Sequence, residues 1–218
     1  MTWLEFKVLA ASEGLTTFYG LNPLEQQTVL KEDVIQAMYE LTKKGWGYVV
    51  NQGFQLNDEM RLIFQQIISA QRLLSVQLKN GRRFIGYLGS DMVTMTCERN
   101  GMMCIQGMEY EKLADWLEEE ILFTVPFWQD EIEAQEALND NEVSLSEISK
   151  LQKAEYEDFP LIAEIEVRGE KGESLLKKDI FVKGITNIWI IGENSNCFYP
   201  DSVRRRETLI SEWREMRG

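Results

Sequence analysis

The sequence contains no histidine. This absence excludes Ser-His-Asp and Cys-His nucleophile systems, metal sites built on imidazole, and an imidazole general base. Ser195 and Cys197 in the GENSNC stretch have no histidine to activate them, so a polar loop is the better interpretation there. We expect no catalytic residue and no metal site, and therefore a protein that is not an enzyme.

Cysteine and long apolar runs are also scarce. Cys97, Cys104 and Cys197 are an odd number without C-x-x-C spacing, so neither a disulfide framework nor a zinc site is indicated. No apolar run approaches the roughly 18 residues that a membrane span needs. The opening MTWLEFKVLA lacks the charged start and cleavage site of a signal peptide. We expect a cytoplasmic bacterial protein without membrane insertion.

Basic residues are outnumbered, with 23 Lys and Arg against 36 Asp and Glu, for a net charge of -13. Because nucleic-acid binding draws on Lys and Arg to neutralise phosphates, this balance argues against a nucleic-acid partner. More than half of the excess lies between Asp130 and Asp158, where ten acids accompany only Lys150 and Lys153. We interpret residues 130–158 as a connection followed by a helix over 144–155, with an acidic docking strip as the alternative.

Nucleotide-binding motifs are missing as well. Neither GxxxxGK[ST] nor GxGxxG after a strand occurs, and GEKGES at Gly169–Ser174 joins two polar strands without a following helix. KNGRR at Lys79–Arg83 is a basic hairpin tip, which is typical of a solvated sheet edge. We expect no cofactor. An enzyme that uses carboxylates or a small molecule stays open as an alternative.

The most informative stretch that is present runs from Leu74 to Leu122. Two strand pairs, LLSVQL with FIGYL and DMVTMTCE with MMCIQ, each surround an Asn-Gly dipeptide, at Asn80-Gly81 and Asn100-Gly101. Asn-Gly between apolar runs predicts a type I′ hairpin, because both central residues need positive φ. The amphipathic run EYEKLADWLEEEIL then predicts a helix that closes the unit.

A matching order of elements returns after Phe159-Pro160. Strand signals at LIAEIEVRG, SLLKKDIFVKG, ITNIWIIG and CFYP are followed by a helix capped by Asp201 or Ser202. The sequence therefore predicts an α+β fold with two quasi-equivalent halves, in which antiparallel hairpins are flanked by helices. We place the halves at residues 1–128 and 129–218, within one compact unit.

Two helices are predicted before the first hairpins. One begins at Asn22-Pro23 and runs to Lys44, with Gly45 as its C-cap, and the other begins after the N-cap Asn57. The first twenty residues pack on the body as a strand or a short helix. Helix, short ribbon and helix also fit a winged-helix regulator, but residues 57–72 offer only Arg61 and Arg72 as cations for DNA.

Methionine is concentrated in the first predicted sheet. Five of the nine methionines lie there, and this flexible side chain suits surfaces that repack around apolar partners, although ordinary core filling is the simpler explanation. We predict the sheet as a partner-binding surface, with the contact residues Met92, Met95, Met102 and Trp189.

The order of elements resembles the EspG family, the cytosolic chaperones of type VII secretion. The resemblance rests on a helix ending in Leu41 to Trp46, a short connection, a helix opening at Leu56 to Glu59, and two sheet-plus-helix halves over residues 25–216. Near the last hairpin only Trp189 and Gly192 match the pattern. The resemblance implies a non-catalytic chaperone or adaptor that binds a helical secreted protein, WXG100-like or LXG-type, and keeps it soluble for export.

Overall fold

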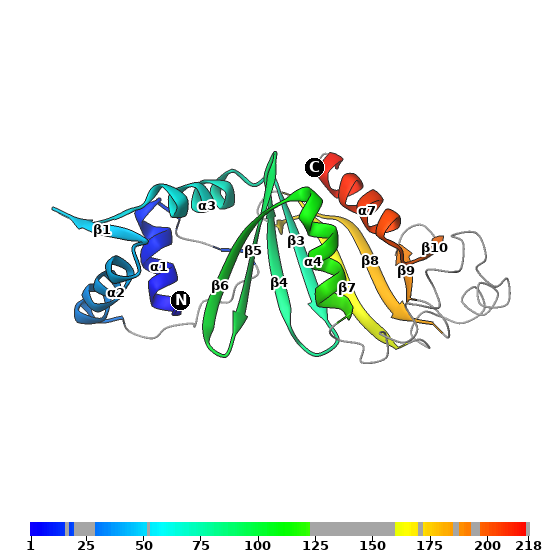
Figure 1. The fold of residues 1–218 in the computed structure, drawn as a ribbon, viewed down its shortest axis with the longest axis horizontal. Helices are drawn as coiled ribbons and strands as arrows, with labels where there is room; N and C mark the ends of the chain where they lie inside the picture. The colour runs from blue at the N-terminus through cyan, green and yellow to red at the C-terminus, as the bar shows by residue number, and fades with distance from the viewer. Residues whose placement is uncertain are drawn as a thin grey trace.

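The computed structural model describes residues 1–15, 18–19, 29–51, 53–122, 160–169, 172–184, 188–192 and 197–216. It is an α+β fold, as the sequence predicts. One antiparallel sheet forms the centre, with a helical unit to one side of it and two further helices across one face (Figure 1).

The helical unit precedes the sheet in the chain. It consists of α1 (Trp3–Ser12), α2 (Lys31–Lys43), the hairpin strands β1 (Gly47–Val50) and β2 (Gly53–Leu56), and α3 (Asp58–Ser69). Helix α1 begins at a capping box, in which Thr2 Oγ1 accepts from Glu5 N and Glu5 Oε2 accepts from Thr2 N. The predicted N-cap of α3 is confirmed, because the Asn57 side chain accepts from Met60 N.

The helix predicted from Asn22 begins later than expected. Leu30 has an extended backbone and is the N-cap of α2, so the helix starts at Lys31, while residues 20–28 lie outside the described part of the chain. Its predicted end is confirmed. Gly45 has a φ of 75°, and Trp46 N donates to Leu41 O across the helix end, as in a Schellman cap.

The sheet has eight strands in the order β10-β9-β8-β7-β3-β4-β5-β6, and every neighbouring pair is antiparallel. The first four in the chain form one meander that ends in helix α4 (Tyr110–Leu122): β3 (Arg72–Leu78), β4 (Arg83–Leu88), β5 (Met92–Arg99) and β6 (Met102–Glu109). The second meander ends in helix α7 (Val203–Glu215): β7 (Leu161–Arg168), β8 (Leu175–Lys183), β9 (Ile188–Gly192) and β10 (Cys197–Pro200).

The two meanders meet at their first strands. Strand β3 pairs with β7 from Leu73 opposite Arg168 to Leu78 opposite Ala163, so the sheet is continuous from one half to the other. The predicted boundary at residues 128 and 129, the acidic stretch 130–158 and the predicted helix 144–155 all lie outside the described residues.

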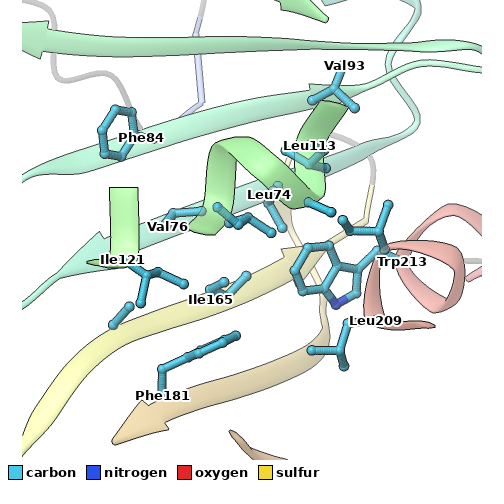
Figure 2. Packing of buried hydrophobic residues seen from close by; sticks show 14 of the residues in the cluster. Leu74, Val76, Phe84, Val93, Leu113, Ile121, Ile165, Phe181, Leu209 and Trp213 are labelled. Atoms are coloured by element: carbon cyan, nitrogen blue, oxygen red, sulfur yellow. The ribbon is translucent and has the colours of Figure 1, made fainter. Parts of the chain in front are cut away.

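Helices α4 and α7 cover the same face of the sheet, called here the α4 face (Figure 1). Between them and the strands lies a core that draws on both halves, with Leu74, Ile165, Leu113 and Trp213 among its buried side chains (Figure 2). Arg206 of α7 also contacts Glu118 of α4 at 2.8 Å. The two halves therefore share one hydrophobic core.

The opposite face is called here the α1 face. Over β3 to β6 it packs against α1 and α3, through residues such as Phe6, Phe64, Ile85 and Tyr87. Over β8 and β9 it carries a smaller buried cluster of Ile180, Val182, Trp189 and Ile191. Because apolar side chains point to both faces, the strands lack a clean alternation of polar and apolar residues.

The two Asn-Gly turns differ from each other. At the β5–β6 turn Asn100 has a φ of 54° and Gly101 a φ of 73°, which confirms the predicted type I′ turn. At the β3–β4 turn only Gly81 has positive φ, and Leu78 N donates to Arg82 O, which closes a three-residue loop. The type I′ prediction is wrong there, because one extra residue moves the glycine to the last loop position.

Candidate partner-binding surface

Two of the four predicted contact residues are buried, so their placement on an open surface is wrong. Met95 is 3% exposed and lies in the α4-face core, where its sulfur fills the space left by the missing side chain of Gly86. Trp189 is 0% exposed and belongs to the cluster on the α1 face of β8 and β9. The physical reason is that the sheet is covered on both faces at these positions.

Met92 and Met102 are more accessible, but they do not lie together. Met92 is half-buried on the α1 face, near Ile63 of α3. Met102 is 42% exposed at the start of the edge strand β6, where it forms an isolated bridge with Thr2. The four predicted residues are thus divided between two faces and both meanders. A partner role for Met92 and Met102 stays a prediction.

Exposed apolar side chains gather instead on the helical unit. Helix α2 and strand β1 pack against each other and expose five large side chains, which we define as the α2–β1 surface: Ile35, Tyr39, Tyr48, Val49 and Val50. Tyr39 is the most exposed of them, at 62%. Since exposed apolar side chains that cluster mark interaction sites more often than isolated ones do, this surface is the strongest candidate for binding a partner.

The sequence explains why α2 leaves these side chains outside. Ala37 and Leu41 are buried against the rest of the helical unit, with Met38 half-buried beside them. Ile35 and Tyr39 are four residues apart and share a different side of the helix. Helix α2 therefore has an inner apolar side that holds it to the protein and a second apolar stripe that faces outward.

An ion pair with a buried carboxylate holds the end of α2 to α1. Lys44 Nζ lies 2.5 Å from Glu5 Oε1, and the Glu5 side chain is almost completely buried. Burial alone raises the pKa of Glu5, but hydrogen bonds from Lys44 and from the Thr2 backbone outweigh it and lower the pKa below its usual value. The carboxylate is thus kept ionised while it fixes the helix that carries Ile35 and Tyr39.

Close packing at one end of the β1–β2 hairpin makes the other end project. An added Cβ at Gly47 would lie 2.4 Å from Gln55 O and 2.5 Å from the Phe54 ring, so only glycine fits where β1 leaves the body. Phe54 and Leu56 of β2 are buried at this end. The three residues after Gly47 extend away from the molecule (Figure 1).

The edge of β1 is also open. Among the residues that the structure describes, β1 pairs only with β2. None of its four residues is charged, although proteins usually protect exposed edge strands with charge or proline. The α2–β1 surface can therefore offer a partner both apolar contacts and unpaired backbone groups.

A hollow of about 630 Å³ between the tips of the β3–β4 and β5–β6 hairpins is a second, more polar candidate. Trp3 Nε1 donates to Glu98 Oε2 at 3.3 Å on its wall. Arg82 lies 2.7 Å from Glu120 Oε2 and 5.0 Å from the centre of the Phe84 ring. The sequence predicts a solvated basic tip, but Arg82 is bound by Glu120 and Phe84 of the same protein. Its charge is therefore less available to hold an anion in the hollow.

The described part of the chain contains no cluster of three or more Cys, Asp or Glu side chains that could hold a metal ion. None of the described helices is both long and apolar enough to cross a bilayer.

The α2–β1 surface was missed at the sequence level for a physical reason. The segment Gly47–Val50 reads GYVV, a composition that is equally typical of a buried strand. The one signal that distinguishes it is its length, because the strand has only four residues before Asn51 and so offers little surface for another element to pack on.

No protein-family model matches the chain, and no curated protein matches it closely enough to count as a relative.

Proposed function

We propose that this protein is a non-catalytic cytosolic chaperone or adaptor, which binds a helical substrate of a type VII secretion system and keeps it soluble for export. Two meanders that each end in a helix, joined in one sheet, agree with the architecture that the resemblance to the EspG family implies. The observation that carries the proposal is the exposed apolar α2–β1 surface.

The outward stripe of α2 supplies the means of binding. Ile35 and Tyr39 are one helical turn apart, which is the spacing that a second helix recognises when it packs along the first. Strand β1, which packs against α2, adds three exposed apolar side chains, with Tyr48 and Val50 on one face of the strand and Val49 on the other. A helical client whose apolar side lies along α2 would cover the stripe and one face of this hairpin, and would gain protection from aggregation in return.

The test is co-expression with small helical proteins encoded beside this chain, WXG100-like and LXG-type proteins first. A stable one-to-one complex is expected by size-exclusion chromatography, with the dissociation constant measured by calorimetry. The proposal fails if none of these proteins forms a complex with the chain.

Tyr39→Glu locates the binding surface within that complex. The charge lies on the outward stripe of α2 and should weaken client binding about ten-fold or more, as loss of an aromatic anchor does at other interfaces. Leu175→Glu is the matched control, because Leu175 is also exposed, at 44%, but lies on β8 in the second meander. If both variants bind the client equally well, the client occupies another surface.

A further inference from the structure

Two free cysteines lie directly opposite each other on neighbouring strands. Cys97 of β5 and Cys104 of β6 are Cα partners in the register of the second hairpin, and neither takes part in a disulfide. Cys97 is half-buried against the α4-face core, and Cys104 is exposed. Their thiols are close enough to hydrogen-bond to each other.

The backbone holds the pair at a distance that a disulfide can bridge. Residues directly opposite in an antiparallel pair have Cα atoms roughly 4.5–5.5 Å apart, which falls within the usual 4.4–6.8 Å for disulfides. The type I′ turn at Asn100-Gly101 fixes this register. A bond between the two sulfurs therefore requires no shift of one strand along the other.

The position of the pair in the ladder also predicts that the bond would be strained. Met103 exchanges two backbone hydrogen bonds with Met1, so its N–H and C=O point away from β5. The next pair, Cys97 and Cys104, must then be a hydrogen-bonded pair, in which Cβ atoms lie toward the wider end of about 4.5–5.5 Å. Since disulfides prefer about 3.8 Å between Cβ atoms, the strands would be drawn together and the bond would be easily reduced.

We propose that Cys97 and Cys104 form a reversible dithiol–disulfide site that accepts a small disulfide oxidant of the glutathione class. This inference is independent of the proposed function. The exposed Cys104 thiolate attacks one sulfur of oxidised glutathione, which forms a mixed disulfide and releases one glutathione thiolate. Cys97 then attacks the Cys104 sulfur and releases the second glutathione. The two thiol protons of the protein pass to the two glutathione thiolates.

The order of attack follows from the surroundings of the two thiols. Burial, and after it the electrostatic interaction and hydrogen bond with the neighbouring Cys104 side chain, raise the pKa of Cys97 to about 11. Cys97 is therefore protonated at neutral pH, and it is also shielded by the core beneath α4. Because thiolates are the species that attack disulfides, the more exposed Cys104 reacts first. Once Cys104 is in the mixed disulfide, its thiol no longer raises the pKa of Cys97, so Cys97 ionises more readily and can resolve the bond.

Oxidation would act on the edge of the sheet. The bond would cross-link the β5–β6 hairpin next to Met103, which holds Met1 through two backbone hydrogen bonds. Thr2, the N-cap of α1, follows immediately. The site thus connects a thiol reaction to one of the strands against which the helical unit packs.

The experiment uses the full chain, equilibrated with oxidised and reduced glutathione, quenched in acid, alkylated and digested with trypsin. Arg99 lies between the two cysteines, so residues 84–99 and 100–112 become separate peptides unless a disulfide joins them. We expect the joined peptide, with Cys197 still alkylated, and its complete loss after dithiothreitol treatment. A stable glutathione adduct on Cys104 without the joined peptide, or a bond to Cys197, would overturn the proposal.

Three variants separate the roles of the thiols. Cys197→Ser should form the joined peptide as the unaltered chain does. Cys97→Ser should stop at a glutathione adduct on Cys104, and Cys104→Ser should form neither adduct nor disulfide in the native protein. If Cys97→Ser and the unaltered chain give the same products, Cys97 does not resolve the mixed disulfide and the proposal is wrong.

Discussion

Methionine plays different parts at different positions of the same sheet. Met95 fills a gap over Gly86 inside the α4-face core, whereas Met102 stands exposed on the edge strand. Both are unbranched and polarisable, so the residue type alone cannot say whether it fills a core or faces a partner. The surrounding elements decide, because α4 covers the position of Met95.

This contrast predicts that the same substitution destabilises the protein strongly at Met95 and very little at Met102. Met95→Asp places an unpaired carboxylate in the core and should lower the free energy of unfolding by at least about 3 kcal/mol. Met102→Asp should change it by less than about 0.5 kcal/mol, because the new side chain remains in water. Urea denaturation followed by circular dichroism measures both values, and equal losses for the two variants would contradict the assigned burial.

Local sequence predicted a hairpin turn and the ends of two helices. The Asn100-Gly101 turn, the N-cap Asn57 and the C-cap Gly45 follow from backbone preferences that neighbouring residues do not override. Which residues are covered did not follow, because neither GYVV around Val49 nor MVTMTCER around Met95 shows by its composition whether another element packs on it. Met95 is buried because α4 covers it, and Val49 is exposed because β1 projects from the body, and neither outcome follows from the residues of the strand itself.

At the scale of elements, α1 and α2 depend on one carboxylate. Glu5 closes the capping box at the start of α1 through one oxygen and binds Lys44, just after α2, through the other. A single side chain thus fixes both the beginning of the first helix and the position of the second. The α2–β1 surface is held in place from the inside by this contact.

Glu5→Gln should therefore destabilise the protein by about 1–2 kcal/mol at pH 7. Because the folded state lowers the pKa of Glu5, its contribution is present above the pKa of the unfolded chain and is lost as the pH falls through the folded value. The difference between Glu5→Gln and the unaltered protein should shrink in acid. Thermal unfolding at pH 7 and at a pH below the usual glutamate pKa tests this, and a constant difference would contradict it.

Considered as a whole, the protein has two halves but one cooperative core. The pairing of β3 with β7 and the shared packing of α4 and α7 leave no surface along which the meanders could separate without breaking the sheet. Domains that share a core unfold together, whereas domains joined only by a linker unfold in separate steps.

Ile165→Ala tests this cooperativity. Ile165 is fully buried at the centre of the sheet, so its truncation should cost about 2–5 kcal/mol. We expect a single unfolding transition before and after the substitution, with the same shift by tryptophan fluorescence and by circular dichroism. Two transitions, of which only one moves, would indicate two independently folding halves.

The antiparallel seam between β3 and β7 has a consequence for how such a chain could arise. The order of the strands reads the same outward from this seam in both directions, which is the arrangement that two copies of one chain would give in a homodimer. A chain of half the length could close the same eight-stranded sheet with a second copy of itself. Duplication and fusion of its gene would then let the copies diverge. The α2–β1 surface lies outside the repeated part, because α2 and β1 precede the first meander, so this chain presents the surface once beside a sheet built from two matching meanders.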